Sequence, residues 1–538
     1  MAAMLAPVPE LSTDEPAAAT PYLPCSLYRD WIRSVAVSGA QMGSTVFSNS
    51  MSQSGHSGSS YSSHSSYSSH SSYSNYSSAS SCSAGADAED FGANELTKIA
   101  HQMVSDGYTQ RMLQAFVVAS LPALDRALEN RLSGIELYDV PSPVPALGNG
   151  GGPNTVLESW FCGLDVGWVL QICQERGSQW QFRLQDKSAS SLQDLVERWI
   201  RGLTVIVHSL TELVSNSVGI CVESVATEWF GKASISKMLV FVEAIMPDLK
   251  AEKLHAVLDM YICVSNALHM LRSFGMSTRN QQIFSAARDL LSTQGDMLWE
   301  AISSTMEEMR ALVEGDDDLW AMEIRHGGGG VHNNTRLVVS SILSMKKTVA
   351  LMTGTFTWLD YDFKLDVLID ETVYYLNDLL LRKSELCLDP SLRYLFLLNN
   401  SYFVVSLNFH LPRWYQRSLI FKLAPECKKY MDSYLDVSWG HVLSCIPKSN
   451  FNGPLQCWKN TSSLAKFESA FHKTYQAQKF WKVPEPQLRD ALRKTIIESV
   501  ISSYRDYLEE HPELAEQVSH GSSSPEVLEE MLRELFEG

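Results

Sequence analysis

The sequence predicts an all-α protein made of several helical bundles stacked end to end. Apolar residues recur at three- and four-residue spacing through most of the chain. Alternating strand patterns joined by hairpin turns are absent. The chain has 538 residues, which is more than one hydrophobic core organises. Helices of this number bury their apolar stripes most simply when bundles stack on one another.

Composition divides the chain into three regions. We expect residues 1–92 to be a disordered tail, because serine dominates between residues 43 and 85 and the hexamer that starts at Tyr61 repeats from Tyr67. Such a stretch cannot bury enough apolar surface to offset its chain entropy. It is open to two interpretations, a tolerated repeat expansion or a phosphorylatable regulatory tail. Residues 93–190 are an expected N-terminal helical region, and residues 191–538 are the expected stacked bundles.

Two helices show the pattern most clearly. One is expected to begin with Ser191 as its cap, with Asp194 three residues further on. The last helix is expected to have Ser524 as its cap and Pro525 at its first position. The first stripe comprises Leu192, Leu195, Val196, Trp199, Ile200, Leu203, Ile206 and Leu210, and the second comprises Val527, Leu528, Met531, Leu532, Leu535 and Phe536.

Charge and cysteine usage limit the possible partners and compartment. The formal net charge is −18, so nucleic acid is not an expected partner, and binding to an anionic membrane needs a local basic patch. The ten cysteines are scattered without CxxC spacing, which favours a reducing cytosol. The first ten residues lack a secretory pattern, and no uninterrupted apolar run approaches the ~20 residues of a transmembrane helix. We expect a cytoplasmic protein, not secreted, that is peripheral to any membrane it contacts.

The glycine run after His326 is the feature most suggestive of chemistry. A His-Gly-Gly-Gly sequence forms an oxyanion hole in some esterases, but no nucleophile stands in a Gly-x-Ser-x-Gly elbow. A phosphate-binding loop needs a glycine, four intervening residues and then Gly-Lys-Ser/Thr, and the chain has no such run. We therefore interpret residues 326–330 as a flexible loop between helices. No catalytic residue, metal site or cofactor is predicted, since the histidines form no HExxH pattern.

Five blocks, in order along the chain, resemble the exocyst seventy-kilodalton subunit family in its divergent plant-type form. The most distinctive are Gly-Gly-Gly-Val-His-Asn-Asn-Thr-Arg at residues 328–336, Ser-Leu-Arg-Tyr-Leu-Phe-Leu-Leu-Asn-Asn at residues 391–400, and a helix-packing block at residues 463–538. Shorter similarities lie at residues 96–108 and 197–200. The resemblance extends from Leu96 to the last residue.

The resemblance implies an elongated curved rod of stacked antiparallel helical bundles without enzymatic activity. It implies a scaffold in exocytosis that tethers secretory vesicles to the plasma membrane. The expected partners are other exocyst subunits and small GTPases. Family members also bind phosphoinositides through basic residues near the C-terminal end.

The chain departs from the family at that end. Acidic residues outnumber Arg505 and Arg533 from residue 505 onward, and residues 515–524, just before the last helix, contain no lysine. Phosphoinositide binding is therefore expected to be weakened. A basic stretch lies just upstream, which is either a remaining anionic-lipid patch or a solvated helix face. It comprises Lys466, Lys473, Lys479, Lys482, Arg489, Arg493 and Lys494.

Two further departures concern structure and function. Asn333 and Asn334 replace a Pro-Leu pair of the family, which is expected to loosen the start of the following helix. Residues 1–92 are rich in serine and tyrosine, whereas the family has a heptad-based coiled coil in the corresponding position. An alternative hypothesis is therefore a repurposed family member, acting outside the assembled exocyst in plant immune signalling. It would serve as an interaction hub or pathogen-effector target, with immune receptors or effectors as its partners.

Overall fold

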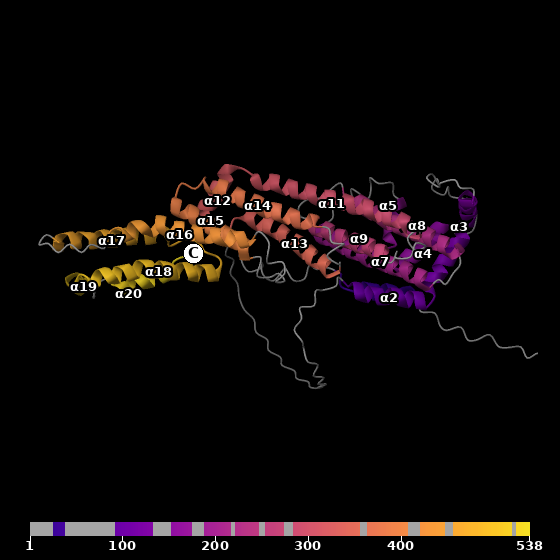
Figure 1. Ribbon diagram of the computed structural model, residues 1–538, viewed down its shortest axis with the longest axis horizontal. Coiled ribbons are helices and arrows are strands. Elements are labelled where there is room, and N and C mark those ends of the chain that lie inside the picture. Colours follow the sequence, from indigo (N-terminus) through magenta and orange to yellow (C-terminus); the bar gives the residue numbers. More distant parts are fainter. Residues whose placement is uncertain are drawn as a thin grey trace, which may run out of the picture. The chain divides into compact units, whose positions relative to one another are not determined.

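The chain is helical throughout its described part in the computed structural model (Figure 1). The described residues are 25–37, 92–132, 152–174, 188–216, 221–246, 253–273, 283–355, 363–406, 420–446, 456–518 and 523–537. Within these ranges, the strand-type pairing consists of an isolated antiparallel bridge between Lys482 and Glu537. The all-α prediction is confirmed.

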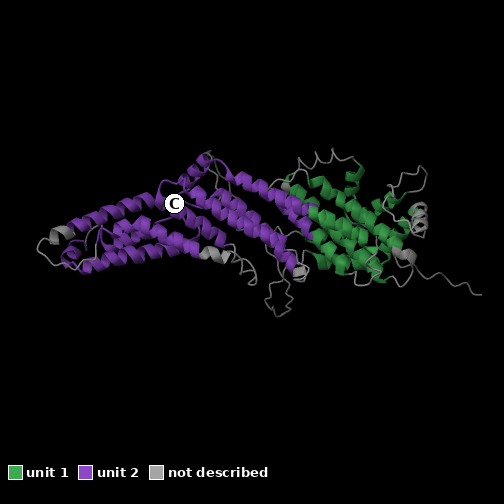
Figure 2. Cartoon of the chain, turned by 45° about the horizontal axis from the view of Figure 1, so that its top comes forward, with its two compact units in different colours: residues 1–248, 263–296 green, residues 249–262, 297–538 purple. Residues whose placement is uncertain are grey.

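The helices group into two compact units, which Figure 2 shows in different colours. Unit 1 comprises residues 1–248 and 263–296, and unit 2 comprises residues 249–262 and 297–538. Helices α9 (Leu254–Ser273) and α11 (Ser285–Glu314) each contribute residues to both units. Unit 1 otherwise contains α1 (Cys25–Ser34), α2 (Ala93–Ser105), α3 (Tyr108–Leu132), α4 (Pro153–Gly163), α5 (Trp168–Gln174), α7 (Ala189–Asn216) and α8 (Cys221–Ile245). Unit 2 otherwise contains α12 (Asp317–His326), α13 (Asn333–Thr355), α14 (Lys364–Ser384), α15 (Pro390–Ser406), α16 (Ile420–Leu443), α17 (Gln456–Gln478), α18 (Pro486–Glu509), α19 (Pro512–Val518) and α20 (Pro525–Arg533).

Helix α7 forms the centre of unit 1. Its predicted apolar stripe is buried apart from the half-buried Leu195. The buried Trp199 donates its indole hydrogen to the Met238 carbonyl of α8, at 2.7 Å. The cap differs from the prediction, because the Ser188 hydroxyl accepts the Ser191 N–H at 3.3 Å and the helix starts at Ala189. Ser188 provides the same capping chemistry three residues earlier.

Helix α1 lies within the region predicted to be a disordered tail. Tyr28 and Ile32 are buried, and the Tyr28 hydroxyl donates to Asp106 at 2.6 Å. Arg33 also donates to Asp165 at 2.5 Å. Residues 25–37 are therefore folded against unit 1, and the expectation of disorder is wrong for them. The rest of residues 1–91 lies outside the described residues.

Unit 2 contains an antiparallel bundle of α16, α17 and α18. The Tyr434 hydroxyl of α16 donates to Gln478 of α17 at 2.5 Å, while Trp439 packs on Phe471 further back along α17. Phe467 of α17 in turn stacks on Tyr504 of α18, with 4.5 Å between ring centroids. These pairings confirm the prediction of antiparallel helices for this part of the chain. The three helices lie side by side in Figure 1.

The last helix keeps its predicted cap and loses part of its predicted stripe. The Ser524 hydroxyl accepts the Val527 N–H at 3.4 Å, and Pro525 is the first helical residue. Leu528 and Leu532 are buried, whereas Val527 is exposed and Met531 is half-buried. The helix ends at Arg533, so the buried Leu535 and Phe536 belong to the turn that follows it.

The glycine loop, residues 327–330, connects α12 to α13 and is packed rather than flexible. Gly328 and Gly329 are buried and have φ angles of +58° and +75°, in the left-handed region that favours glycine. A Cβ atom at Gly328 would lie 3.0 Å from the Phe480 carbonyl oxygen. A Cβ atom at Gly329 would lie 3.0 Å from Leu392. The loop is between helices as predicted, but the predicted flexibility is wrong.

Two asparagine side chains of α15, which we call the asparagine latch, hold this loop. Asn399 donates to the Gly329 carbonyl at 2.7 Å and to the Lys482 carbonyl at 2.8 Å. Asn400 donates to the Gly330 carbonyl at 3.2 Å. The Asn400 amide oxygen accepts the His332 N–H at 3.0 Å and the Thr335 hydroxyl at 2.7 Å. The latch therefore joins the α12–α13 loop, α15 and the α17–α18 connection.

Helix α13 begins with the N–H groups of Asn333 and Asn334 hydrogen-bonded, although Pro-Leu is replaced there by these two asparagines. The Asn333 N–H donates to Glu323 at 2.8 Å, and the Asn334 N–H donates to His332 Nδ1 at 3.1 Å. His332 is buried and stacks on Trp320 with ring centroids 3.6 Å apart. Burial lowers the pKa of His332 to about 4. The expectation of a loosened helix start is wrong, because neighbouring side chains cap the helix.

One described helix, α9, is long and apolar enough to span a membrane by length and composition alone. Its best window has a mean hydropathy of 1.2, and 67% of that window is buried inside the protein. This burial is typical of a core helix in a folded protein, whose apolar side chains contact neighbouring helices.

Replacing Asn400 with alanine tests the latch. Asn400→Ala leaves the buried His332 N–H and the Thr335 hydroxyl without their acceptor, so the free energy of unfolding should fall by about 3 kcal/mol. Urea unfolding followed by circular dichroism measures this loss. The matched control is Asn216→Ala, which removes an exposed hydrogen bond to Glu212 and should cost about 0.5 kcal/mol or less. Equal losses in the two variants would contradict a special role for Asn400.

Candidate functional site

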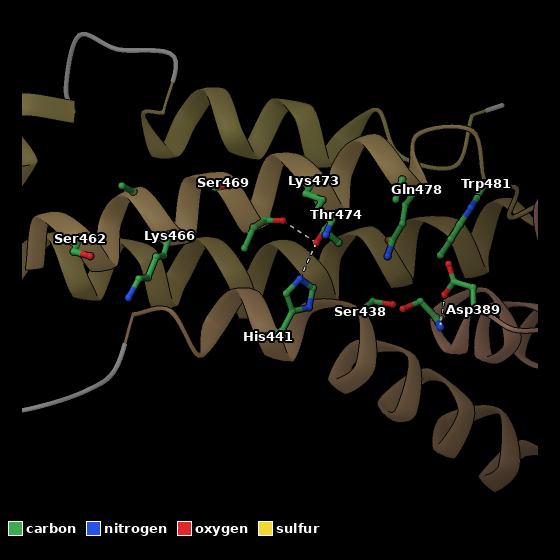
Figure 3. A pocket seen from close by; sticks show the side chains of 14 residues that line it. Asp389, Ser438, His441, Ser462, Lys466, Ser469, Lys473, Thr474, Gln478 and Trp481 are labelled. Carbon is green, nitrogen blue, oxygen red and sulfur yellow. Dashed lines mark hydrogen bonds between the residues drawn. The ribbon is translucent and has the colours of Figure 1, made fainter. Parts of the chain in front are cut away.

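Two of the seven candidate basic residues, Lys466 and Lys473, line one groove in unit 2. The groove runs between α16 and α17 and has a volume of about 680 Å³ (Figure 3). The lysines are seven residues apart on α17, which places them on one face of the helix. Both are exposed. We call this feature the basic groove.

Hydroxyl groups accompany the lysines in the basic groove. Ser462 and Ser469 lie on the same face of α17, and His441 contributes from α16. Thr474 lies 3.2 Å from His441 Nε2 and donates to the Ala470 carbonyl at 2.8 Å. Asp389 is the acidic residue that lines the groove. The arrangement offers positive charge and hydrogen-bond donors to an anionic group.

Lys479 and Lys482 lie outside the groove, in the connection between α17 and α18. The Lys479 ammonium is 5.9 Å from the centroid of the exposed Phe480 ring. The Lys482 backbone is fixed on both sides, since its N–H donates to Gly328 at 2.9 Å and its carbonyl accepts from Asn399. Its side chain is exposed. This connection therefore presents two exposed lysines, of which Lys479 lies beside an apolar ring and Lys482 is on a fixed backbone.

Arg493 and Lys494 interact with the protein's own acceptors on α18. Arg493 is 15% exposed, and its Nε donates to the Leu535 carbonyl at 2.8 Å. Its second hydrogen bond to this carbonyl and an ion pair with Glu537, at 3.1 Å, hold the chain after α20. Lys494 lies 3.7 Å from Glu498 on the same helix. Arg489 is half-buried. Arg493 therefore holds the chain after α20 in place, whereas Lys494 remains 75% exposed.

The acidic C-terminal segment has its two arginines engaged with carboxylates. Arg533 donates to Glu529 at 2.5 Å, and Arg505 donates to the same carboxylate at 2.9 Å. These hydrogen bonds, that of Arg533 first, lower the pKa of Glu529. Glu526 is the nearest further acid, 3.7 Å from Arg505. The positive charges of this segment are consequently screened by neighbouring carboxylates.

Sequence reasoning missed the other polar residues of the basic groove. Ser462 and Ser469 are seven residues apart, and this spacing could have placed them on one helical face. His441 comes from a different helix, so no local pattern could have indicated it. Among the described residues, no three His, Cys, Asp or Glu side chains are placed to hold a metal ion. Cys162, Cys173, Cys387, Cys427 and Cys445 are free thiols.

The fold defines an all-α protein of packed, largely antiparallel helices. Residues 197–534 match the family profile that describes the C-terminal part of Exo70, a component of the exocyst complex. This match covers more than half of the chain, and the protein belongs to the Exo70 family of exocyst subunits.

Curated relatives from Arabidopsis thaliana agree with this assignment. The chain is 26% identical over 351 residues to exocyst complex component EXO70B2, covering 62% of this chain and 56% of the relative. It is 26% identical over 303 residues to exocyst complex component EXO70A3, covering 53% of this chain and 50% of the relative. The chain thus spans about half the length of these relatives. The crystal structure of the Saccharomyces cerevisiae exocyst component Exo70p aligns over 82% of this chain and 96% of its own, with 14% identity and a TM-score of 0.36.

Because Arg493 holds another segment of the chain and the groove lysines are exposed, replacing them should affect the stability of the fold differently. Arg493→Met removes hydrogen bonds from a mostly buried guanidinium to the Leu535 carbonyl, so unfolding should become easier by about 2 kcal/mol. Lys473→Met changes an exposed side chain and should alter stability by about 0.5 kcal/mol or less. Thermal unfolding of the full chain compares the two. If Lys473→Met is the more destabilising variant, the assignment of a structural role to Arg493 and not to Lys473 is incorrect.

Proposed function

We propose that this protein is a non-enzymatic scaffold of the exocyst-related tethering machinery, acting in exocytosis where secretory vesicles meet the plasma membrane. The observation that carries the proposal is the match of residues 197–534 to the Exo70 C-terminal profile. The curated relatives it resembles are named exocyst complex components. A cytoplasmic protein, peripheral at the plasma membrane, is the corresponding location.

The position of the resembling segments supports this proposal. Three of them are the α12–α13 loop with the start of α13, the end of α15, and the C-terminal block. The asparagine latch connects these same three segments through hydrogen bonds to Gly329, Gly330 and Lys482. The resemblance therefore falls on residues that hold the helices of unit 2 together. Because the asparagine latch lies in segments that resemble the family, we infer that this chain has the family's helical framework. A common framework favours a scaffold role.

Phosphoinositide binding belongs to the proposal in a weakened form. Lys466 and Lys473 present charge in the basic groove, Lys479 presents it beside Phe480, and Lys482 is exposed in the same connection. By contrast, Arg493 of α18 donates to the Leu535 carbonyl, Lys494 lies near Glu498, and the arginines near α20 share one carboxylate. We infer a membrane contact centred on the groove lysines, opposed by the acidic segment that follows.

Affinity purification of the tagged full chain from plant cells tests the scaffold role. Other exocyst subunits should be recovered, with small GTPases as substoichiometric partners. The control is Asn400→Ala, which weakens the asparagine latch. This variant should recover less of the other exocyst subunits, in proportion to its loss of folded protein. Recovery of immune receptors or effectors without any exocyst subunit would overturn the proposal in favour of a repurposed role in immune signalling.

Vesicle sedimentation tests the lipid contact. The full chain should bind vesicles that contain phosphatidylinositol bisphosphate, and the Lys466→Ala/Lys473→Ala variant should bind about 30-fold more weakly, because each lysine near an anionic surface contributes ~1 kcal/mol. Lys428→Ala is the matched control, since Lys428 is exposed on α16 and does not line the groove. Equal affinity of the double variant and the unchanged protein would remove the groove from the membrane contact.

A further inference from the structure

Helix α14 has an exposed apolar stripe with a seven-residue repeat. Val367, Tyr374 and Leu381 are 54%, 70% and 38% exposed. Leu388, which is 93% exposed, lies in the segment that follows the end of the helix at Ser384. Residues seven apart lie almost directly above one another on a helix. Single exposed apolar residues are ordinary, but several aligned along one face mark a contact surface.

An acidic edge runs beside this stripe. Glu371, Asp378 and Glu385 each follow a stripe residue by four positions, so they occupy the same outer face of the helix. All three are exposed. Asp378 accepts from Arg382 at 2.9 Å, and Glu385 accepts from Arg393 at 3.3 Å, in exposed pairs that water screens. The face therefore combines an apolar stripe with carboxylates at the same seven-residue period.

The stripe is distinct from the face by which α14 joins the core. The inner face buries Leu368, Leu376 and Leu379. On one side, the Tyr375 hydroxyl donates to the Arg310 carbonyl of α11 at 2.9 Å. On the other side, Asn377 donates to Glu426 of α16 at 3.3 Å. Between these contacts, the described residues of unit 2 leave Val367, Tyr374 and Leu381 of the outer face exposed.

We propose that the outer face of α14 is a docking site for an amphipathic helix of a partner protein, with apolar residues at heptad spacing and lysine or arginine beside them. A seven-residue repeat on one helix matches a partner of the same period, because two helices that pack along their length share it. Basic flanks would lie opposite Glu371, Asp378 and Glu385. A second copy of this face would instead oppose carboxylates with carboxylates, and the same charges repel an anionic membrane.

The test uses a synthetic peptide of three identical heptads, with leucine at the two core positions and lysine at the flanking positions. Its binding to the full chain is followed by fluorescence anisotropy. The Tyr374→Ser/Leu381→Ser variant leaves the net charge unchanged and should bind at least about tenfold more weakly. Glu371→Lys should also weaken binding, and a peptide with glutamate in place of lysine should bind less well than the lysine peptide.

Val118→Ser is the matched control, because Val118 is an exposed apolar residue on α3 of unit 1 and should not affect binding. Far-UV circular dichroism confirms that each variant is folded. Unchanged affinity in Tyr374→Ser/Leu381→Ser would overturn the proposal, since attraction to the acidic chain as a whole would then explain binding. Absence of peptide binding would overturn it as well. Self-association of the unchanged chain in sedimentation velocity, lost in the double variant, would assign the face to a second copy instead.

Discussion

Unit 2 depends on the pairing of two asparagine amides with a glycine loop. Asn400 uses both ends of its amide, with its oxygen accepting from His332 and Thr335 and its nitrogen donating to Gly330. Burial of such an amide costs least free energy when its donors and acceptors are satisfied together. The loop can approach closely because its central glycines lack a side chain and adopt left-handed backbone angles. The asparagine side chains and the glycine loop therefore fit in one arrangement. Displacing either of them leaves buried hydrogen-bonding groups without partners.

The sequence predicted what is local and missed what joins distant segments. Apolar periodicity identified α7 and α20, since a helical stripe depends on residues three and four positions apart. The cap of α7 was misplaced because Ser188 and Ser191 offer the same chemistry within one turn. The packing of the glycine loop could not be predicted, because the partners of Gly329 and Gly330 lie 70 residues away. Helix α1 was missed because its few apolar residues gain their burial only from contacts with unit 1.

The sequence likewise predicted the net charge of the basic stretch but not which of its side chains face solvent. The basic stretch of α17 and α18 has a net positive charge in the sequence, yet Arg493 faces the Leu535 carbonyl while Lys473 faces the basic groove. A guanidinium that is desolvated by backbone acceptors stabilises the fold and is withdrawn from ligands. An exposed ammonium keeps its hydration and remains available to an anion. Whether a cationic residue serves structure or binding is thus decided by the acceptors around it.

The outer face of α14 is held rigid by contacts on its inner side. The Lys383 ammonium lies 2.5 Å from the Asp317 carboxylate and 5.8 Å from the centroid of the Trp320 ring of α12. Trp320 stacks on His332, whose backbone N–H donates to Asn400 of the latch. A chain of packed and hydrogen-bonded groups therefore connects the proposed docking helix to the asparagine latch. A partner that binds there meets an already ordered helix, so association costs less conformational entropy than it would on a loop.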